Sequence, residues 1–272
     1  MENSQANGVW RPAHEVHAIE RVTASFFFQE PLSSKPWQTL INSASSSLPS
    51  LGFNAMVEVP ELPLPPNQTV VLAPHSPWPG GRIFQSLQGS QVHEEIGVFK
   101  NLLSYTATRY NRWGNFQERL FLLISPLLKV ALNTIDINAI KLEYWDRFIF
   151  EGPKEEVSYS ELFIRTSSFL PVFTSSSREL WHSHVGFFVP AEANKRLINI
   201  NVDILDIADP GGEGQTKRSA AIYLMAQDTF AESPPQDRIS TALNGMHTSL
   251  KDVFNDLISP SMASRISLNK PE

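Results

Sequence analysis

The sequence predicts an α+β protein made of two tandem units, each an antiparallel sheet with a long helix across one face. The clearest observation lies near the C-terminus, where three strand-like segments and one long amphipathic helix follow one another between 181 and 258. A similar, less regular order recurs between about 54 and 135. Grouped strands with helices on one face are typical of α+β folds. A helix-grip or TATA-box-protein-like topology fits this order, and an internal duplication is a hypothesis that it raises.

The N-terminal unit is expected at 15–152, after a loose arm at 1–14. Its first strand is predicted between 16 and 28, because apolar residues alternate there along one face (Val22, Ala24, Phe26 and Phe28). A helix should follow, with Ser34 as its N-cap and Pro36 in its first turn. Pro49 and Gly52 are expected to end it.

The rest of this unit reads as short strands, a second helix and a longer strand. The short strands are predicted at 55–59, 69–72, 82–88, 95–99 and 102–110, and a helical turn between the last three is the alternative. Asn115 is expected to cap the second helix, which contains Pro126 and therefore either kinks or restarts there. From 139 to 150 apolar residues alternate with Lys141, Glu143 and Arg147, which predicts a strand with one wet face.

The C-terminal unit is expected at 153–272, after a boundary at Glu151-Gly152-Pro153-Lys154. A short helix is predicted at 158–165, and strands at 185–189, 197–207 and 220–226. The strand at 197–207 has the sharpest pattern. Asn199, Asn201 and Asp203 point one way, and the apolar residues between and beside them point the other (Ile198, Ile200, Val202 and Ile204). An apolar stripe from about 238 to 258 predicts a final helix packed on this sheet.

Composition excludes several classes of protein. The 272 residues have a formal net charge of -6 and no dense Lys/Arg cluster, which argues against a broad nucleic-acid footprint. No apolar run approaches the length of a membrane span. The absence of cysteine excludes disulfides, thiolate metal sites and a cysteine nucleophile. A cytoplasmic location is the expectation that fits best.

One basic and aromatic cluster is a candidate ligand site. Arg109, Arg112 and Arg119 lie near Tyr105, Tyr110 and Trp113 in the sequence. Such a group could receive a phosphate or a partner's carboxylate, whereas a salt-bridged rim is the commoner use of the same residues.

Three histidines form the other candidate site. His182 and His184 are two residues apart on a predicted strand, so their side chains share a face. A metal would need a third ligand, for which Glu192 or His247 are candidates. The segment Gly211–Ser219 lacks the spacing of a phosphate loop, and no Gly-x-Ser-x-Gly motif occurs. We therefore predict no catalytic residue, no metal and no cofactor.

Short motifs along most of the chain resemble a family of sporadically distributed bacterial proteins of unsettled function. They are Tyr110…Trp113…Phe116, the segment from Ile140 to Phe148, Leu243-Asn-Gly-Met-His247, Val253-Phe254 and Ile258-Ser-Pro. The family tends to have arginine, tyrosine and an Asn-Arg pair in its middle strand, where this chain has Lys141 and Trp145-Asp146-Arg147. The resemblance implies no catalytic residues. The patchy distribution of this family among bacteria suggests an anti-phage role.

Three functional hypotheses remain open at this point. The first is a non-enzymatic binding or sensing protein that acts with a protein partner or as a homodimer, in bacterial anti-phage defence. The second is a carrier of a small apolar ligand, in a pocket between helix and sheet lined by Phe187, Ile200, Val202, Met246 and Leu250. The third is a metal-dependent hydrolase that uses His182, His184 and an acidic residue.

Overall fold

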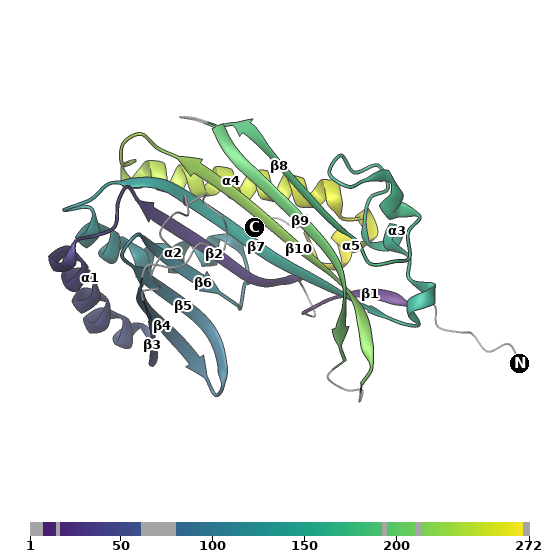
Figure 1. The fold of residues 1–272 in the computed structure, drawn as a ribbon, viewed down its shortest axis with the longest axis horizontal. Helices are drawn as coiled ribbons and strands as arrows, with labels where there is room; N and C mark the ends of the chain where they lie inside the picture. Colours follow the sequence, from purple (N-terminus) through teal and green to yellow (C-terminus); the bar gives the residue numbers. More distant parts are fainter. Residues whose placement is uncertain (1–7, 15–16, 61–79, 192–194, 210–213, 269–272) are drawn as a thin grey trace, which may run out of the picture. The chain divides into compact units, whose positions relative to one another are not determined.

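The chain forms a mixed α+β structure with a large antiparallel sheet, as the sequence predicts (Figure 1). The computed structural model describes residues 8–14, 17–60, 80–191, 195–209 and 214–268. The strands hydrogen-bond in the order β3-β4-β5-β6-β2-β7-β10-β9-β8, and β1 pairs with β7. Each pairing with a described register is antiparallel.

Two compact units divide the chain. Unit 1 comprises residues 1–22, 143–227 and 243–272, and unit 2 comprises 23–142 and 228–242. Three elements run through both units: β2 (Ile19–Phe28), β7 (Ile137–Glu151) and α4 (Gln236–Leu257). Each unit is therefore assembled from segments that are distant in the sequence.

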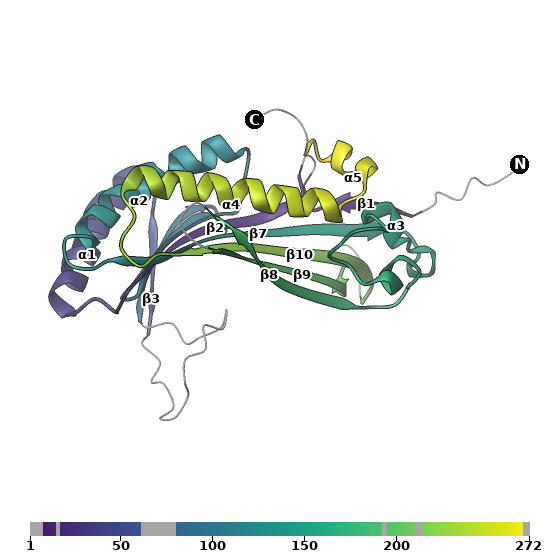
Figure 2. The same cartoon turned by 90° about the horizontal axis from the view of Figure 1, so that it is seen from above.

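Unit 2 consists of a small antiparallel sheet covered by two helices (Figure 2). Its elements are α1 (Ser34–Ser47), β3 (Ala55–Val59), β4 (Gly81–Gln88), β5 (Gln91–Phe99), β6 (Leu102–Ala107) and α2 (Trp113–Ala131). A short 3₁₀ turn, Leu48–Leu51, follows α1 and ends at Gly52, whose φ of 99° is in the left-handed region that favours glycine. Tyr105 of β6 stacks on Phe116 of α2, with ring centroids 5.2 Å apart. This aromatic contact joins the helix to the sheet.

Unit 1 carries the second set of strands and the C-terminal helices. Its elements are β1 (Val9–Pro12), α3 (Tyr159–Leu162), β8 (His182–Pro190), β9 (Lys195–Ala208), β10 (Thr216–Thr229) and α5 (Pro260–Arg265). The predicted alternation of the 197–207 strand is confirmed, because Ile198, Ile200, Val202 and Ile204 are all buried. Together with the apolar stripe of α4, which includes Met246 and Leu250, these four residues form one buried layer.

The two faces of the strands in unit 1 are distinguished by their contacts with α4. Tyr144 of β7 hydrogen-bonds to His247 of α4, and Arg196 of β9 donates to Ser249. Residues one position away on these strands point to the opposite side. We call that side, formed by β8, β9, β10 and β7, the open face of unit 1.

The N-terminal residues depart from the expected loose arm. Val9–Pro12 form β1, which pairs with Phe148–Glu151 of β7. Trp10 is fully buried there, and its Nε1 donates to the backbone oxygen of Ser158 at 3.0 Å. A four-residue strand containing proline has no periodic pattern to reveal it.

The second helix begins two residues before the predicted cap. Arg112 occupies the N-cap position of α2, and Asn115 lies inside the first turn. The helix then continues through Pro126 without a restart. Pro126 leaves the carbonyl of Leu122 without its usual donor, and Leu122 lies on the exposed face, where water can hydrogen-bond to it. The predicted strand at 69–72 lies outside the described residues.

The prediction that one face of the 139–150 strand is in contact with water is wrong for Glu143. Glu143 is buried, because it accepts a hydrogen bond from Tyr223 of β10. Asp146, which the alternation assigns to the apolar side, is also buried there. A strand inside a sheet places polar side chains beside neighbours that the chain's own pattern does not reveal.

No helix among the described residues is long and apolar enough to cross a membrane, in agreement with the composition.

Gly97 provides a test of packing in unit 2. A Cβ at Gly97 would lie 2.4 Å from Oγ of Ser104 and 2.6 Å from Cε2 of Phe99. We expect Gly97→Ala to lower the free energy of unfolding by about 1–3 kcal/mol, through overpacking. Gly114→Ala on α2 is the matched control, because nothing lies within 4 Å of its added Cβ. Urea unfolding of both variants checks this, and an unchanged stability of Gly97→Ala would contradict it.

Candidate functional site

The three predicted arginines do not surround a common site. Arg119 of α2 is paired with Glu94 of β5: its Nε is 2.9 Å from Oε1, and its Nη2 is 2.9 Å from Oε2. The same Nη2 also donates to the backbone oxygen of Leu51 at 2.8 Å. Arg109 donates at 3.5 Å to Gln88 on the surface, and Arg112 occupies the N-cap of α2. Arg119 therefore joins β5, α2 and the 3₁₀ turn.

Glu94 also accepts a hydrogen bond from the hydroxyl of Tyr105, at 2.6 Å. Burial raises the pKa of Glu94, but the hydrogen bonds from Arg119 and Tyr105 outweigh it and hold the pKa below its usual value. Burial, with the bond to Glu94, raises the pKa of Tyr105. Glu94 thus stays ionised and Tyr105 stays protonated at neutral pH. We call Arg119, Glu94 and Tyr105 the unit 2 brace.

The three predicted histidines lie on two different faces of the sheet. His182 and His184 project from the open face of unit 1, and His182 Nδ1 is 4.0 Å from Oδ1 of Asp203. His247 lies on the α4 side, where its Nδ1 is 3.0 Å from the hydroxyl of Tyr144. Glu192 lies outside the described residues. In the described part of the chain no group of three or more His, Asp or Glu residues is arranged to hold a metal ion.

A row of polar and aromatic side chains crosses the open face of unit 1. His184 of β8 is opposite Asn201 of β9, which is opposite Tyr223 of β10. The ring of Tyr223 lies 5.0 Å from that of Trp145 on β7, and the guanidinium of Arg21 on β2 lies 3.8 Å above the Trp145 ring. We call these five residues the cross-strand row. Each comes from a different strand, so the register of the sheet creates the row.

Tyr223 is fixed in this row by a buried carboxylate. Its hydroxyl donates to Oε1 of Glu143 at 2.6 Å. Burial, followed by the negative charge of Glu143, raises the pKa of Tyr223. Tyr223 therefore remains a neutral hydroxyl across the physiological pH range, which suits it to hydrogen bonding rather than to proton transfer.

An amide and an exposed apolar rim complete this surface. Oδ1 of Asn201 is buried and has no hydrogen-bond partner within the described residues. Gly186 leaves room for the neighbouring amide, because a Cβ there would lie 2.7 Å from Oδ1 of Asn199. Phe188 and Leu205 on the same face are 65% and 45% exposed. The surface combines fixed polar groups with apolar side chains in contact with water.

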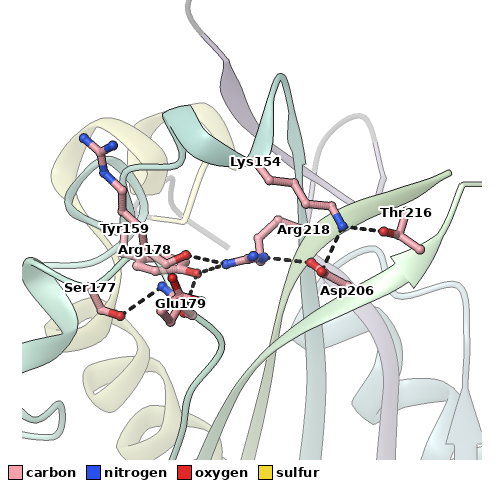
Figure 3. A network of polar contacts seen from close by, with 8 residues as sticks. All are labelled: Lys154, Tyr159, Ser177, Arg178, Glu179, Asp206, Thr216 and Arg218. Atoms are coloured by element: carbon pink, nitrogen blue, oxygen red, sulfur yellow. Dashed lines mark hydrogen bonds and ion pairs between the residues drawn. The ribbon is translucent and has the colours of Figure 1, made fainter.

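A second polar network in unit 1 surrounds a buried arginine (Figure 3). Arg218 Nε donates to Oδ1 of Asp206 at 2.8 Å, and its Nη1 donates to the hydroxyl of Tyr159 and to the backbone oxygen of Arg178, both at 2.7 Å. Lys154 donates to the other oxygen of Asp206 at 2.8 Å. We call Arg218, Asp206 and Tyr159 the unit 1 brace. The bonds of Arg218 join β10 to β9, α3 and the segment at Arg178, which is a structural role.

Asp146 is the remaining unusual ionisable group of unit 1. It lies on the α4 side of β7 and is only 4% exposed. Burial, followed by the negative charge of Glu20, raises its pKa to about 8. Asp146 is therefore mainly neutral at pH 7.

Four of the five residues expected to line an apolar-ligand pocket are buried, whereas the fifth, Phe187, is half-buried. Ile200, Val202, Met246 and Leu250 are each at most 1% exposed. A carrier would need space among these side chains, and their burial is also what a packed core produces.

Comparisons with known proteins give no relative from which to transfer a role. Neither the scan against protein-family models, nor the searches of curated proteins and of solved structures, found a match. The cross-strand row is thus identified by its geometry alone. The sequence indicated part of it, since Asn201 was expected on a polar face and His184 was a candidate ligand, but the row itself depends on strand pairing.

Arg218 and Lys154 contact the same carboxylate and should differ strongly in their contribution to stability. We expect Arg218→Ala to lower the free energy of unfolding by about 1–3 kcal/mol, because it leaves the buried hydroxyl of Tyr159 and the carbonyl of Arg178 without their donor. Lys154→Ala should cost less than about 1 kcal/mol, because its ion pair is partly exposed. Guanidinium unfolding measures both values. Equal losses would show that the unit 1 brace does not depend on Arg218.

Asp146 predicts a pH dependence of stability. In the folded state Asp146 keeps its proton up to about pH 8, whereas in the unfolded chain it ionises near the ordinary aspartate pKa of 3.8. Stability should therefore fall as pH rises between these values and level off above them, by several kcal/mol in order of magnitude. Asp146→Asn should remove this slope. Unfolding curves between pH 4 and 9 test it, and identical slopes in the two proteins would contradict it.

Proposed function

We propose that this chain is a non-enzymatic binding protein that holds a protein partner on the open face of unit 1. The observation that supports the proposal best is the cross-strand row itself. It places Arg21, Trp145 and Tyr223 side by side on a sheet face that α4 does not cover. Tryptophan, tyrosine and arginine are the residue types that dominate binding energy at protein interfaces.

The row is organised before a partner arrives. Tyr223 is held by Glu143, and Trp145 lies between the Tyr223 ring and the Arg21 guanidinium. Little side-chain entropy remains to be lost at these positions on binding, which favours affinity. The unpartnered oxygen of Asn201 supports the same proposal, since a donor from a partner would satisfy it after a small rotation of the amide.

Phe188 and Leu205 would contribute the apolar part of such an interface. Both are large, exposed and on the same face as the row. Interfaces commonly combine a few aromatic and arginine anchors with apolar area that excludes water. A role in cytoplasmic anti-phage defence is part of this proposal and rests on the family resemblance.

We also propose that the two sets of strands arose by internal duplication, in a helix-grip or TATA-box-protein-like arrangement. The hydrogen-bonding order supports this. After β2 it continues through β6, β5, β4 and β3, and after β7 through β10, β9 and β8. In each set the chain order therefore runs from the outermost strand inward, with one more strand in the first set. In both sets a helix follows the last strand, α2 in one and α4 in the other. An experimental structure whose halves do not superpose would remove this proposal.

The partner proposal is tested with variants of the row. We expect the wild-type chain, used as bait in its native host, to retain a specific protein that then binds the purified chain directly. Trp145→Ala and Arg21→Ala should each weaken that binding by roughly 10- to 100-fold, the range expected for interface anchors. Calorimetric titration with the purified partner measures the change.

Leu122→Ala is the matched control for these variants. Leu122 is a large exposed apolar residue on α2, which belongs to unit 2, whereas the open face belongs to unit 1. It should bind the partner with wild-type affinity. Melting curves establish that all variants are folded, and full affinity in Trp145→Ala and Arg21→Ala would refute the proposed site.

A further inference from the structure

Among the described residues, strand β8 ends the hydrogen-bonded order of the sheet and has one neighbour in it, β9 (Figure 1). We propose that β8 pairs antiparallel with β8 of a second copy of this chain, so that the chain forms a homodimer through this edge. This inference concerns the backbone edge of β8, although its pairing also brings in His184 of the cross-strand row and Phe188 of the apolar rim. It does not depend on the proposed partner.

The pairing with β9 shows which backbone groups of β8 point outward. The N–H of Ile204 donates to the carbonyl of Trp181 at 2.8 Å, which continues the β8–β9 ladder by one pair. Hydrogen-bonded pairs alternate along an antiparallel ladder, so the odd-numbered residues of β8 bond to β9. The N–H and C=O groups of His182, His184, Gly186 and Phe188 therefore point to the free edge. They form a template for another strand.

Apart from Pro190 at its end, the sequence of β8 lacks the residues that commonly protect a sheet edge. The strand reads HSHVGFFVP and contains no Asp, Glu, Lys or Arg, although charged side chains are a common means of blocking a sheet edge. At the other end of the order, β3 has only five residues and contains Glu58, which is paired with Arg82. The two terminal strands thus differ in the features that protect an edge.

A two-fold axis at Gly186 gives a self-complementary register. His184 of one copy is then opposite Phe188 of the other, and Val185 is opposite Phe187, so exposed aromatic and apolar side chains meet. Gly186 has no side chain to crowd the axis. Pro190, which cannot donate, falls at the end of the ladder opposite His182, where its carbonyl still accepts.

The occupant is a second copy because the edge complements itself. Each copy contributes one β8, and a two-fold axis uses both free edges, so the assembly closes at two chains. Phe188, which is 65% exposed in the single chain, becomes covered by His184 of the second copy. The open faces of the two copies then lie edge to edge.

The decisive comparison uses two substitutions at His184. His184→Pro removes an N–H that points to the free edge and makes no bond to β9, so the internal ladder is kept. His184→Ala removes the same side chain and keeps the N–H. We expect wild-type and His184→Ala chains to sediment as dimers, and His184→Pro to raise the dimer dissociation constant by roughly tenfold or more, since symmetry removes the bond twice.

Sedimentation equilibrium of the full chain, without any added partner, measures these constants, and circular dichroism checks the fold of each variant. A wild-type chain that is monomeric up to about 100 μM would overturn the proposal, because a specific homodimer should form well below that concentration. Equal dissociation constants for His184→Pro and His184→Ala would overturn it as well.

Hydrogen exchange of the wild-type chain decides the question if His184→Pro does not fold. Dimerisation predicts that the amides of His184, Gly186 and Phe188 exchange slowly in concentrated protein and faster on dilution. Fast exchange at every concentration would refute the paired edge. Because no partner protein enters either experiment, a failure here leaves the test of the cross-strand row unaffected.

Discussion

The register between β9 and β10 is the constraint on which both faces of unit 1 depend. It places Tyr223 opposite Asn201, and Ile222 opposite Val202. A slip of one residue would turn every side chain of the slipped strand to the other face, moving isoleucines into water and asparagines against α4. The burial of Ile198, Ile200, Val202 and Ile204 opposes that slip, since each would lose about 2 kcal/mol of apolar burial. The apolar layer thereby also fixes the positions of the polar row.

Local sequence patterns predicted the elements in which buried residues recur with the period of a strand or of a helix. The strand around Ile200 and the helix around Met246 alternate so regularly that their faces could be assigned from the sequence. Strand β1 could not, because its stability comes from Trp10, which is buried against residues about 150 positions away. Glu143 was wrongly assigned to the solvent-exposed face for a related reason. Its hydrogen-bond partner Tyr223 lies on another strand, and the sequence of β7 alone does not reveal this contact. The cross-strand row, assembled from five strands, exists only once strand order and register are known.

Each unit contains one arginine–carboxylate–tyrosine brace of the same chemistry. Arg119 joins α2 to Glu94 in unit 2, and Arg218 joins Asp206 to Tyr159 in unit 1. In both, the arginine also donates to a backbone carbonyl of a non-strand segment, at Leu51 and at Arg178. A planar guanidinium with several donors suits this task, since it can satisfy a carboxylate and a carbonyl at once. The braces connect segments that the apolar core alone would hold with less precision.

The neutral carboxyl of Asp146 has a consequence for the thermodynamics of the whole chain. The formal charge of -6 counts Asp146 as ionised, so the folded protein at pH 7 is nearly one unit less negative than that value. The unfolded chain does not share this difference. Folding at neutral pH therefore takes up close to one proton from the buffer at this position. The calorimetric enthalpy of unfolding will accordingly contain the ionisation heat of the buffer, and will differ between buffers such as phosphate and Tris by close to the difference in those heats.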